Sequence, residues 1–424
     1  MITTTHRIAP ALRALRVLSI SLFLLAGLMQ PAASQTVSTL YTFSPGQNGG
    51  QFLSSPLLKA SDGSLFGETS NGGIGSGVGF GTVIQFTPPA VDGGAWTETV
   101  IYSFLGGVDG LTPAGGLVAD KAGNLYGTTA QGGTVGSCNC GTVFKLKPPA
   151  TPGGIWTKRI LHTFTRMNGD GGYTFGAGVV VDSKGIVYGT TGNGGTYDSG
   201  TVFRIQPQGS GFAVSEIYSF GGTPVDGGFP TTSVTLDAAG NLYGATSLGG
   251  LNGQGTVYEL SPPASGGVWK ETVLYNFQTY FDTSASSALI MDKSGQLYGT
   301  RFTDGANNLG TVYRLTPPTA GQTEWSRTNL WTFQGNGDGG IPGGLAIDRA
   351  TGIFYGMAQY ANFFGGCGVA YQLAPPAVAG GAWQYAVLDH LINFTGCGTS
   401  QPLFRDSAGH LYGFTGNTVY EITP

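Results

Sequence analysis

The sequence predicts an all-β fold built from seven repeated units that close into a ring, and three observations support this expectation. First, the 424 residues include 75 glycines and 22 prolines, whereas only 10% of residues are charged. Second, three short markers recur seven times each in a fixed order. Third, the first unit and the last unit are both incomplete, and together they make one whole unit.

The composition excludes several classes of protein. Disordered chains are rich in charge and poor in aromatic residues, whereas 12% of this chain is aromatic. Glycine and proline at this density break helices, and the chain has no Gly-X-Y period of the kind that collagen needs. An all-β protein with many short strands and many turns remains.

Three markers define the repeated unit, which recurs at intervals of 60, 62, 55, 55, 57 and 57 residues. The first marker is an aromatic–glycine pair, found at Phe66-Gly67, Tyr126-Gly127, Tyr188-Gly189, Tyr243-Gly244, Tyr298-Gly299, Tyr355-Gly356 and Tyr412-Gly413. The second is Gly-Thr-Val or a variant of it, which begins at Gly81, Gly141, Gly200, Gly255, Gly310, Gly368 and Thr418. The third is a short aromatic strand that ends at Phe43, Phe104, Phe164, Phe220, Phe277, Phe333 and Phe394.

Each unit contains four strand-like runs, which we name a to d. In the second unit strands a to c are Gly116–Asp120, Asn124–Thr129 and Gly141–Leu146, and strand d is either Trp96–Phe104 or Trp156–Phe164. Strand a is apolar on both faces, which predicts that other parts of the protein bury both faces. The start of strand d is polar and can face water. Pro-Pro ends strand c in five units, because proline cannot continue a ladder. An order a, b, c, d from inside to outside is typical of a β-propeller blade.

The two incomplete units predict how the ring closes. Residues Val37–Phe43 read as a strand d with no a, b or c before it, and Thr418–Ile422 read as a strand c with no d after it. Pairing these two runs completes a blade and removes two exposed edges. We therefore predict a seven-bladed β-propeller of four-stranded antiparallel blades, with the N-terminal strand in the last blade. An open β-solenoid, which would want capping units at both ends, is the alternative.

The N-terminal residues 1–34 read as a secretory signal peptide, which leaves residues 35–424 as a single propeller domain. Arg7, Arg13 and Arg16 precede an apolar run from Val17 to Met29, and the small residues Ala32-Ala33-Ser34 favour cleavage after Ser34. The run is short for a membrane span, although an uncleaved anchor is the alternative. We expect a secreted protein, extracellular or periplasmic, with no membrane span in the mature chain.

Charge argues against nucleic acid as a partner. The signal peptide carries three of the 19 basic residues and none of the 23 acidic residues, so the mature chain has a net charge of −7. An acidic surface repels nucleic acids and anionic membranes.

Antiparallel strands place the d–a and b–c loops on one rim of the propeller. The d–a loops carry the Asp-Gly turns that begin at Asp109, Asp170, Asp226 and Asp338, and the b–c loops carry Gly-Gly pairs. Exposed backbone of this kind suits a ligand, so these four aspartates are the candidate ligand-binding residues. The alternative, which the pattern favours, is that Asp-Gly simply makes turns.

The opposite rim holds the a–b turns. These turns begin at Asp120, Asp182, Asp237, Asp292, Asp348 and Asp406. The turn at Asp348 has one extra residue before its glycine, Gly352. An aspartate at a turn start accepts hydrogen bonds from N–H groups further along its own turn. One aspartate per blade does not supply the converging oxygens that calcium needs.

Four cysteines in an exported chain are disulfide candidates. Cys367 and Cys397 fall on the same rim in adjacent blades, so we predict that they bond to each other. Cys138 and Cys140 are separated by one residue, and either a disulfide or a metal or redox role is open for them. The histidines of the mature chain, His162, His390 and His410, fall in different units, and the sequence indicates no metal site and no cofactor.

The unit Asp-x-x-Gly-Asn-Leu-Tyr-Gly-Thr-Thr, the Gly-Gly loop, Gly-Thr-Val-Phe and Tyr-Ser-Phe resemble the GloVer tandem-repeat family over nearly all of residues 37–424. The resemblance implies an exported bacterial propeller-like protein with no established activity. The shorter piece Asp-x-x-Gly-Asn-Leu-Tyr is similar to the units of NHL-type and streptogramin-lyase-type propellers.

Three hypotheses for function follow. The first is a non-catalytic scaffold that binds a ligand, glycan or protein on the rim of the d–a and b–c loops, because seven near-equal units lack the singular constellation of an enzyme. The second is a propeller enzyme, a lyase or a lactone or sugar hydrolase, with ionisable groups converging at the channel mouth. The third is a purely structural envelope component. Five tryptophans that open strands d could stack on sugars, although packing at a blade edge is the favoured role: Trp96, Trp156, Trp269, Trp325 and Trp383.

Overall fold

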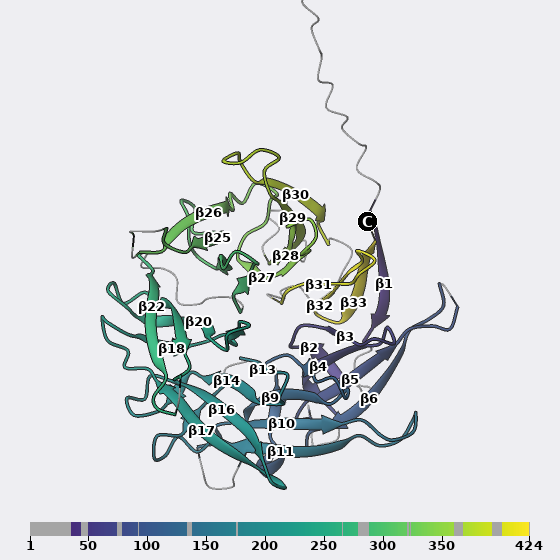
Figure 1. The fold of residues 1–424 in the computed structure, drawn as a ribbon. Coiled ribbons are helices and arrows are strands. Elements are labelled where there is room, and N and C mark those ends of the chain that lie inside the picture. Colours follow the sequence, from purple (N-terminus) through teal and green to yellow (C-terminus); the bar gives the residue numbers. More distant parts are fainter. Residues whose placement is uncertain are drawn as a thin grey trace, which may run out of the picture. The chain divides into compact units, whose positions relative to one another are not determined.

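Seven antiparallel sheets follow one another along the chain as the blades of a β-propeller, which confirms the predicted fold (Figure 1). The computed structural model describes residues 35–43, 50–73, 79–91, 93–133, 138–174, 177–264, 266–278, 288–319, 322, 324–359, 368–391 and 401–423. The predicted signal peptide lies outside these residues, and residues 35–424 form one compact unit.

Every blade has four strand positions from inner to outer, and in several blades the innermost position is split into two short strands. Blade one holds β2 (Gly50–Leu53), β3 (Leu58–Lys59), β4 (Leu65–Gly72), β5 (Thr82–Thr87) and β6 (Thr97–Ser103). Blade two follows the 3-10 turn η1 (Gly107–Asp109) and holds β7 (Leu111–Pro113), β8 (Val118–Ala119), β9 (Leu125–Gln131), β10 (Thr142–Lys147) and β11 (Thr157–Thr163). Blade three holds β12 (Gly171–Gly172), β13 (Val179–Val181), β14 (Val187–Thr191), β15 (Asn193–Gly194), β16 (Thr201–Gln208) and β17 (Gly211–Ser219).

The later blades repeat this plan. Blade four holds β18 (Gly227–Pro230), β19 (Thr235–Leu236), β20 (Leu242–Gly249), β21 (Thr256–Ser261) and β22 (Lys270–Asn276). Blade five holds β23 (Ile290–Met291), β24 (Leu297–Arg301), β25 (Thr311–Thr316) and β26 (Ser326–Thr332). Blade six holds β27 (Pro342–Ile347), β28 (Phe354–Ala358), β29 (Val369–Ala374) and β30 (Gln384–Asp389), and blade seven holds β31 (Phe404–Arg405), β32 (Leu411–Thr415), β33 (Thr418–Thr423) and β1 (Thr36–Thr42).

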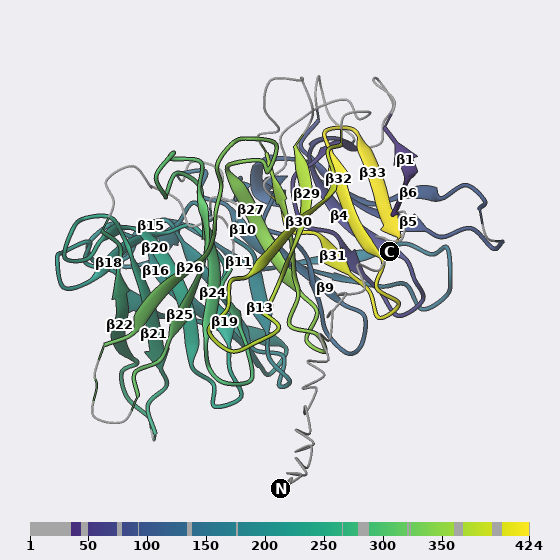
Figure 2. The same ribbon diagram turned by 90° about the horizontal axis from the view of Figure 1, so that it is seen from above.

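The N-terminal strand completes the last blade, as the sequence predicts. β1 pairs antiparallel with β33 in a register that joins Thr36 to Thr423 and Thr42 to Thr418. Both views place the two strands side by side (Figures 1 and 2). The ring therefore closes through hydrogen bonds between the two ends of the propeller, and both edges are paired.

The core lies between neighbouring blades and is built from the third marker. Its phenylalanine is buried and packs edge-on against the aromatic residue of strand c in the next blade. The ring pairs and their centroid distances are Phe104–Phe144 (5.3 Å), Phe164–Phe203 (5.2 Å), Phe220–Tyr258 (5.0 Å), Phe277–Tyr313 (5.7 Å) and Phe333–Tyr371 (5.5 Å). Burial of each ring stabilises its interface by roughly 1.5–3 kcal/mol. The repeated phenylalanine thus joins successive blades.

Two details differ from the sequence prediction. Strand a is less covered than expected, because Ala119 is exposed and Val118 only half-buried on the innermost strand β8. The marker in blade six is also displaced. The register pairs Asp389 with Ala370, so Leu391 takes the buried place of the phenylalanine, and Phe394 lies outside the described residues.

The d–a and b–c loops share one rim, as expected from antiparallel strands. Gly171 of a d–a loop pairs with Gly194 of the following b–c loop, and Gly227 pairs with Gly249 in the same way. A β-carbon on Gly194 would lie 2.4 Å from the carbonyl oxygen of Asp170. The space beside these glycines is thus filled by the backbone of the adjacent loop and not left open for a ligand.

The glycine of the second marker should be intolerant of any side chain. Gly255 has a φ of +86°, and a β-carbon there would lie 2.0 Å from the carbonyl oxygen of Thr246. We expect Gly255→Ala to lower the free energy of unfolding by more than about 3 kcal/mol, because backbone strain and a clash add. Urea denaturation measures this loss.

Gly253→Ala is the matched control for that substitution. Gly253 has a φ of +70°, but nothing lies within 4 Å of its β-carbon position. It should therefore cost only the ~1–2 kcal/mol of the left-handed backbone. Equal losses in the two variants would contradict the clash at Gly255.

The a–b turns form as predicted. Asp120 Oδ1 accepts hydrogen bonds from the N–H groups of Ala122 (2.9 Å) and Asn124 (3.0 Å), and its Oδ2 accepts one from the hydroxyl of Tyr126 (3.0 Å). The N–H pattern recurs at Asp182, Asp237, Asp292 and Asp406. In most blades the side chain of the aspartate therefore accepts hydrogen bonds from the backbone of its own turn.

Candidate functional site

The four rim aspartates are held by donors of their own loops and of the neighbouring strands d. The aromatic residue that opens the third marker donates to the aspartate that follows it by seven or eight residues. Tyr102 Oη donates to Asp109 Oδ1 (2.8 Å), His162 Nε2 lies 2.9 Å from Asp170 Oδ1, and Trp331 Nε1 donates to Asp338 Oδ2 (3.2 Å). Backbone N–H groups donate as well, such as that of Leu105 to Asp109 and that of Gly335 to Asp338. Lys158 of β11 also pairs with Asp109 (3.0 Å).

Sequence reasoning missed this partnership, although the nearly regular spacing of seven or eight residues between marker and aspartate could have shown it. The four carboxylates lie at four different blade interfaces, so they do not converge on one point. Binding of a ligand by these residues stays a prediction.

Asp226 has an unusual neighbour across its blade interface. Gly221 N–H donates to its Oδ2 (2.5 Å), but its Oδ1 is buried without a partner among the described residues. Glu271 of β22 faces it at the register position that Lys158 of β11 occupies beside Asp109. Burial raises the pKa of Asp226, and burial together with the charge of Asp226 raises the pKa of Glu271 to about 7.

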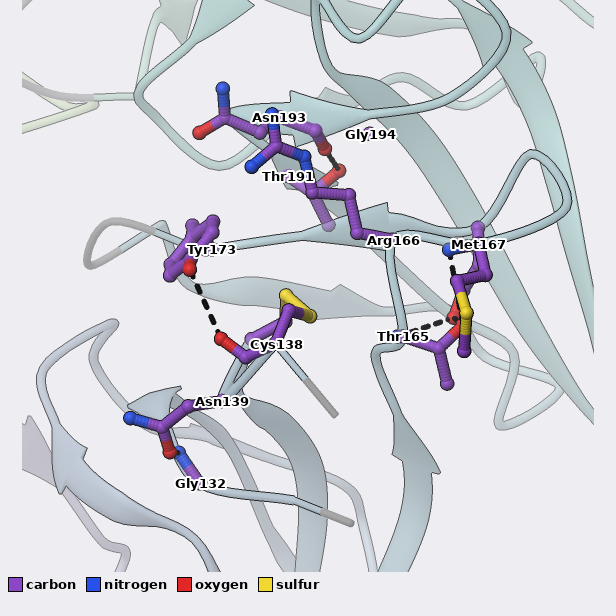
Figure 3. Close-up of a disulfide and its surroundings, with 12 residues drawn as sticks. Gly132, Cys138, Asn139, Thr165, Arg166, Met167, Tyr173, Thr191, Asn193 and Gly194 are labelled. Carbon is purple, nitrogen blue, oxygen red and sulfur yellow. Dashed lines mark hydrogen bonds between the residues drawn. A yellow bond between two sulfur atoms is a disulfide. The ribbon is translucent and has the colours of Figure 1, made fainter. Parts of the chain in front are cut away.

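The cysteine predictions divide between described and undescribed residues. Cys367 and Cys397 lie outside the described residues. Cys138 and Cys140 are placed as a disulfide with their Cα atoms 5.1 Å apart, beside Tyr173, whose hydroxyl donates to the Cys138 carbonyl (3.0 Å; Figure 3). Asn139 between them has a positive φ, and its side chain accepts a hydrogen bond from Gly132 N–H. Within the described residues no three His, Cys, Asp or Glu side chains are grouped to hold a metal ion.

A cavity of about 980 Å³ opens between blades five and six on the rim of the a–b turns. Its lining includes the turn at residues 292–294, strand β26 at residues 328–331, the turn at Arg349 and Gly352, and the c–d connection at residues 375–383. Single side chains of four further strands complete it: Tyr298 of β24, Arg314 of β25, Ile347 of β27 and Phe354 of β28. This is the rim opposite to the one that the sequence indicated. We take this cavity, named the 5/6 cleft, as the candidate functional site.

Aromatic and apolar side chains form one part of the 5/6 cleft. Trp383 is partly buried, and its ring lies 5.8 Å from that of Phe354, which in turn lies 4.6 Å from Tyr298. Leu330 and Ile347 add apolar surface. Trp383 therefore packs at its blade edge, as favoured from the sequence, and still borders the cleft.

Polar side chains on β26 form another part. Thr328 and Asn329 are both exposed and line the cleft. The register position of Asn329 is apolar in four other blades, where it holds Val100, Ile160, Val273 and Val387. An amide at a position that is apolar in four of the other six blades was the sequence signal for this site, and sequence reasoning missed it.

Three basic side chains and one carboxylate complete the lining: Lys293, Arg314, Arg349 and Asp292. Asp292 is occupied by its own turn, because it accepts hydrogen bonds from Ser294 N–H (2.8 Å), Gln296 N–H (3.0 Å) and the hydroxyl of Tyr298 (3.0 Å). Burial alone would raise the pKa of Asp292, but these donors outweigh it and the pKa is lowered. Asp292 is therefore a structural anion.

The seven blades and the seven recurring sequence markers together show that this protein is a β-propeller built from tandem repeats. The chain belongs to the Gloeobacter/Verrucomicrobia repeat family, which matches it over residues 28–235, 135–324 and 231–424. The resemblance seen in the sequence is thereby confirmed. This is a repeat family of unknown function. A search of curated proteins found no match to this sequence.

Several solved structures are similar over most of their length. A protein of unknown function from Dyadobacter fermentans is 12% identical with a TM-score of 0.43, covering 92% of this chain and 98% of its own. A putative 6-phosphogluconolactonase from Bacteroides uniformis is 11% identical with a TM-score of 0.48, covering 89% and 88%. The NanB sialidase of Streptococcus pneumoniae is 11% identical with a TM-score of 0.44, covering 91% and 70%. We draw no functional conclusion from them, because all three TM-scores lie below 0.5.

Among the described residues, none forms a helix with the length and apolar character to cross a membrane.

Proposed function

We propose that this protein is an exported, non-catalytic propeller scaffold that binds a carbohydrate in the 5/6 cleft. The observation that carries the proposal is the pairing of an aromatic, apolar surface around Trp383 with the exposed polar side chains Thr328 and Asn329. A sugar ring has an apolar C–H face that stacks on an aromatic ring, and its hydroxyl groups exchange hydrogen bonds with amides and hydroxyls. Ligand sites combine concave apolar surface with a few placed polar groups in this way.

The lining supports binding over hydrolysis. Glycoside hydrolysis commonly uses two carboxyl groups on either side of the scissile bond. Among the residues that the structure describes, the 5/6 cleft is lined by one carboxylate, Asp292, which the hydrogen bonds of its own turn occupy.

Asn329→Val tests the proposal with little risk to the fold, because four other blades carry an apolar residue at this position. We expect affinity for the bound oligosaccharide to fall about tenfold, since loss of a hydrogen bond in a partly enclosed site costs about 1–1.5 kcal/mol. Binding is measured by calorimetry after an array of neutral and acidic oligosaccharides has identified a ligand.

Thr272→Val is the matched control, because Thr272 is an exposed hydroxyl on the outer strand of blade four. It should leave affinity unchanged. The proposal fails if no oligosaccharide binds, or if Asn329→Val binds as tightly as the parent.

A further inference from the structure

The charges of the 5/6 cleft are opposite in sign to those of the whole protein. Its lining holds Lys293, Arg314 and Arg349 against Asp292, whereas the chain has a net charge of −4. A local excess of positive charge in a concave site attracts anions and focuses their approach. The acidic remainder repels long polyanions, so a short acidic ligand fits this distribution better than a nucleic acid.

Arg349 lines the cleft from a turn that has one extra residue. In blades two to five and blade seven the turn closes with an N–H that donates to the aspartate three residues earlier, as Gly295 does to Asp292. In blade six Gly352 N–H donates to Asp348 four residues earlier (2.8 Å). Arg349 spans the blade interface, where its Nη1 donates to the Met291 carbonyl of blade five (3.1 Å). Lys293 of blade five and Arg349 of blade six each follow the aspartate of their turn, and both line the cleft.

In the part of the chain that the structure describes, no ion pair joins Lys293, Arg314 or Arg349 to a carboxylate. Asp348, next to Arg349, directs its carboxylate away, to the hydroxyl of Thr351 (2.7 Å) and to Arg405 of blade seven (3.2 Å). Within the described residues Arg314 Nε is buried without a hydrogen-bond partner. Guanidinium groups with spare donors are the preferred receptors for planar or tetrahedral anions.

We infer that the ligand of the 5/6 cleft is an acidic carbohydrate, whose carboxylate or sulfate is received by Lys293, Arg314 and Arg349. This inference rests on the proposed function and names the class of sugar. The apolar face of the sugar lies against Trp383, and the acidic group points to the three cations on the two blades.

The test compares one sugar with and without its charge. An oligogalacturonide supplies carboxylates, its fully methyl-esterified form supplies the same rings without charge, and a sulfated disaccharide supplies the other anion. We expect at least one of the two acidic sugars to bind about tenfold tighter than the esterified form. Its affinity should fall as salt rises from 50 to 300 mM, because salt screens exposed charges.

Matched variants separate the cleft cations from cations elsewhere. Arg349→Ala should weaken binding of the acidic sugar about tenfold, whereas Lys121→Ala, the same turn position in blade two, should not. Arg314→Gln should act likewise. Its control is Arg204→Gln at the same register position of blade three, where the Nε is also buried without a partner among the described residues.

The outcomes distinguish this inference from the proposed function. If the esterified sugar binds as tightly as both acidic sugars, the charge inference is overturned and carbohydrate binding stands. If no sugar binds, both fall. If a poly-glutamate peptide binds as tightly as the acidic sugars and Asn329→Val does not change its affinity, the cleft is a receptor for acidic peptides and the carbohydrate class is overturned.

Discussion

A chain that lacks residues 35–43 should lose most of its stability, although the deleted segment is short. The deletion removes β1 with its six register pairs to β33 and the buried Phe43. A large apolar side chain contributes ~1.5–3 kcal/mol and each hydrogen bond about 1 kcal/mol, so the loss is on the order of 5 kcal/mol. Because whole domains are stable by only about 5–15 kcal/mol, we expect a large fall in Tm and aggregation through the exposed edge of β33.

Thermal unfolding of the chains 35–424 and 44–424 measures this effect. A synthetic peptide of residues 35–43, added in excess, should restore part of the lost Tm by mass action. Tyr41→Phe is the control, because it keeps the strand and removes only the hydrogen bond from the Tyr41 hydroxyl to Glu98 (2.7 Å). An unchanged Tm in the truncated chain would show that closure by β1 contributes little.

Stability should fall as pH rises, and Glu68 should cause much of the fall. Glu68 is fully buried on β4, where its Oε2 accepts a hydrogen bond from Gly116 N–H (2.9 Å) and its Oε1 has no partner among the described residues. Burial raises the pKa of Glu68 from 4.5 to about 7. The folded state therefore favours the protonated acid. Stability from this group is complete below pH ~4.5 and is lost as pH rises through about 7.

Glu68→Gln removes this titration at nearly constant shape. We expect the variant to equal the parent near pH 4.5 and to exceed it at pH 8 by up to ~3 kcal/mol, since one pKa unit corresponds to about 1.4 kcal/mol. Urea denaturation at several pH values measures the difference. Glu98→Gln is the control, because Glu98 is a half-buried glutamate on β6. This variant keeps Glu68, so its free energy of unfolding should still fall between pH 4.5 and pH 8 as that of the parent does. Parallel pH profiles for the parent and Glu68→Gln would contradict the prediction.

The position of Glu68 on β4 is one at which other blades form a hydrogen bond to the next blade. Three other blades carry a threonine, whose hydroxyl donates to a carbonyl of the next blade: Thr128 to Ala177 (3.0 Å), Thr190 to Thr232 (2.8 Å) and Thr300 to Gly343 (2.8 Å). Glu68 instead accepts from Gly116. Departures from the repeat, such as Glu68, Asn329 and Arg349, are therefore where this chain differs from a generic propeller.

The fold could be predicted because its causes are local and repeated. Each glycine of Gly-Thr-Val, each aspartate of an a–b turn and each buried phenylalanine acts within one unit or between neighbouring units. Seven copies of the same pattern therefore specify the blade, and the unmatched strands at the two ends specify closure. Phe394 was predicted to be the buried phenylalanine of blade six, but its unit departs from the repeated pattern. The strand register places Leu391 at that buried position instead.

The candidate site could not be predicted in this way, because it is formed by segments that no single repeat unit contains. The sequence by itself determined the blade number, the strand order, the aspartate turns and the shared rim of the d–a and b–c loops. Only the tertiary structure decided that the rim aspartates are bound by their own markers, and that Asn329 of blade five and Arg349 of blade six line one cavity. The physical reason is that hydrogen-bonded turns depend on neighbours in sequence, whereas a cleft depends on how the side chains of two blades fill the space between them.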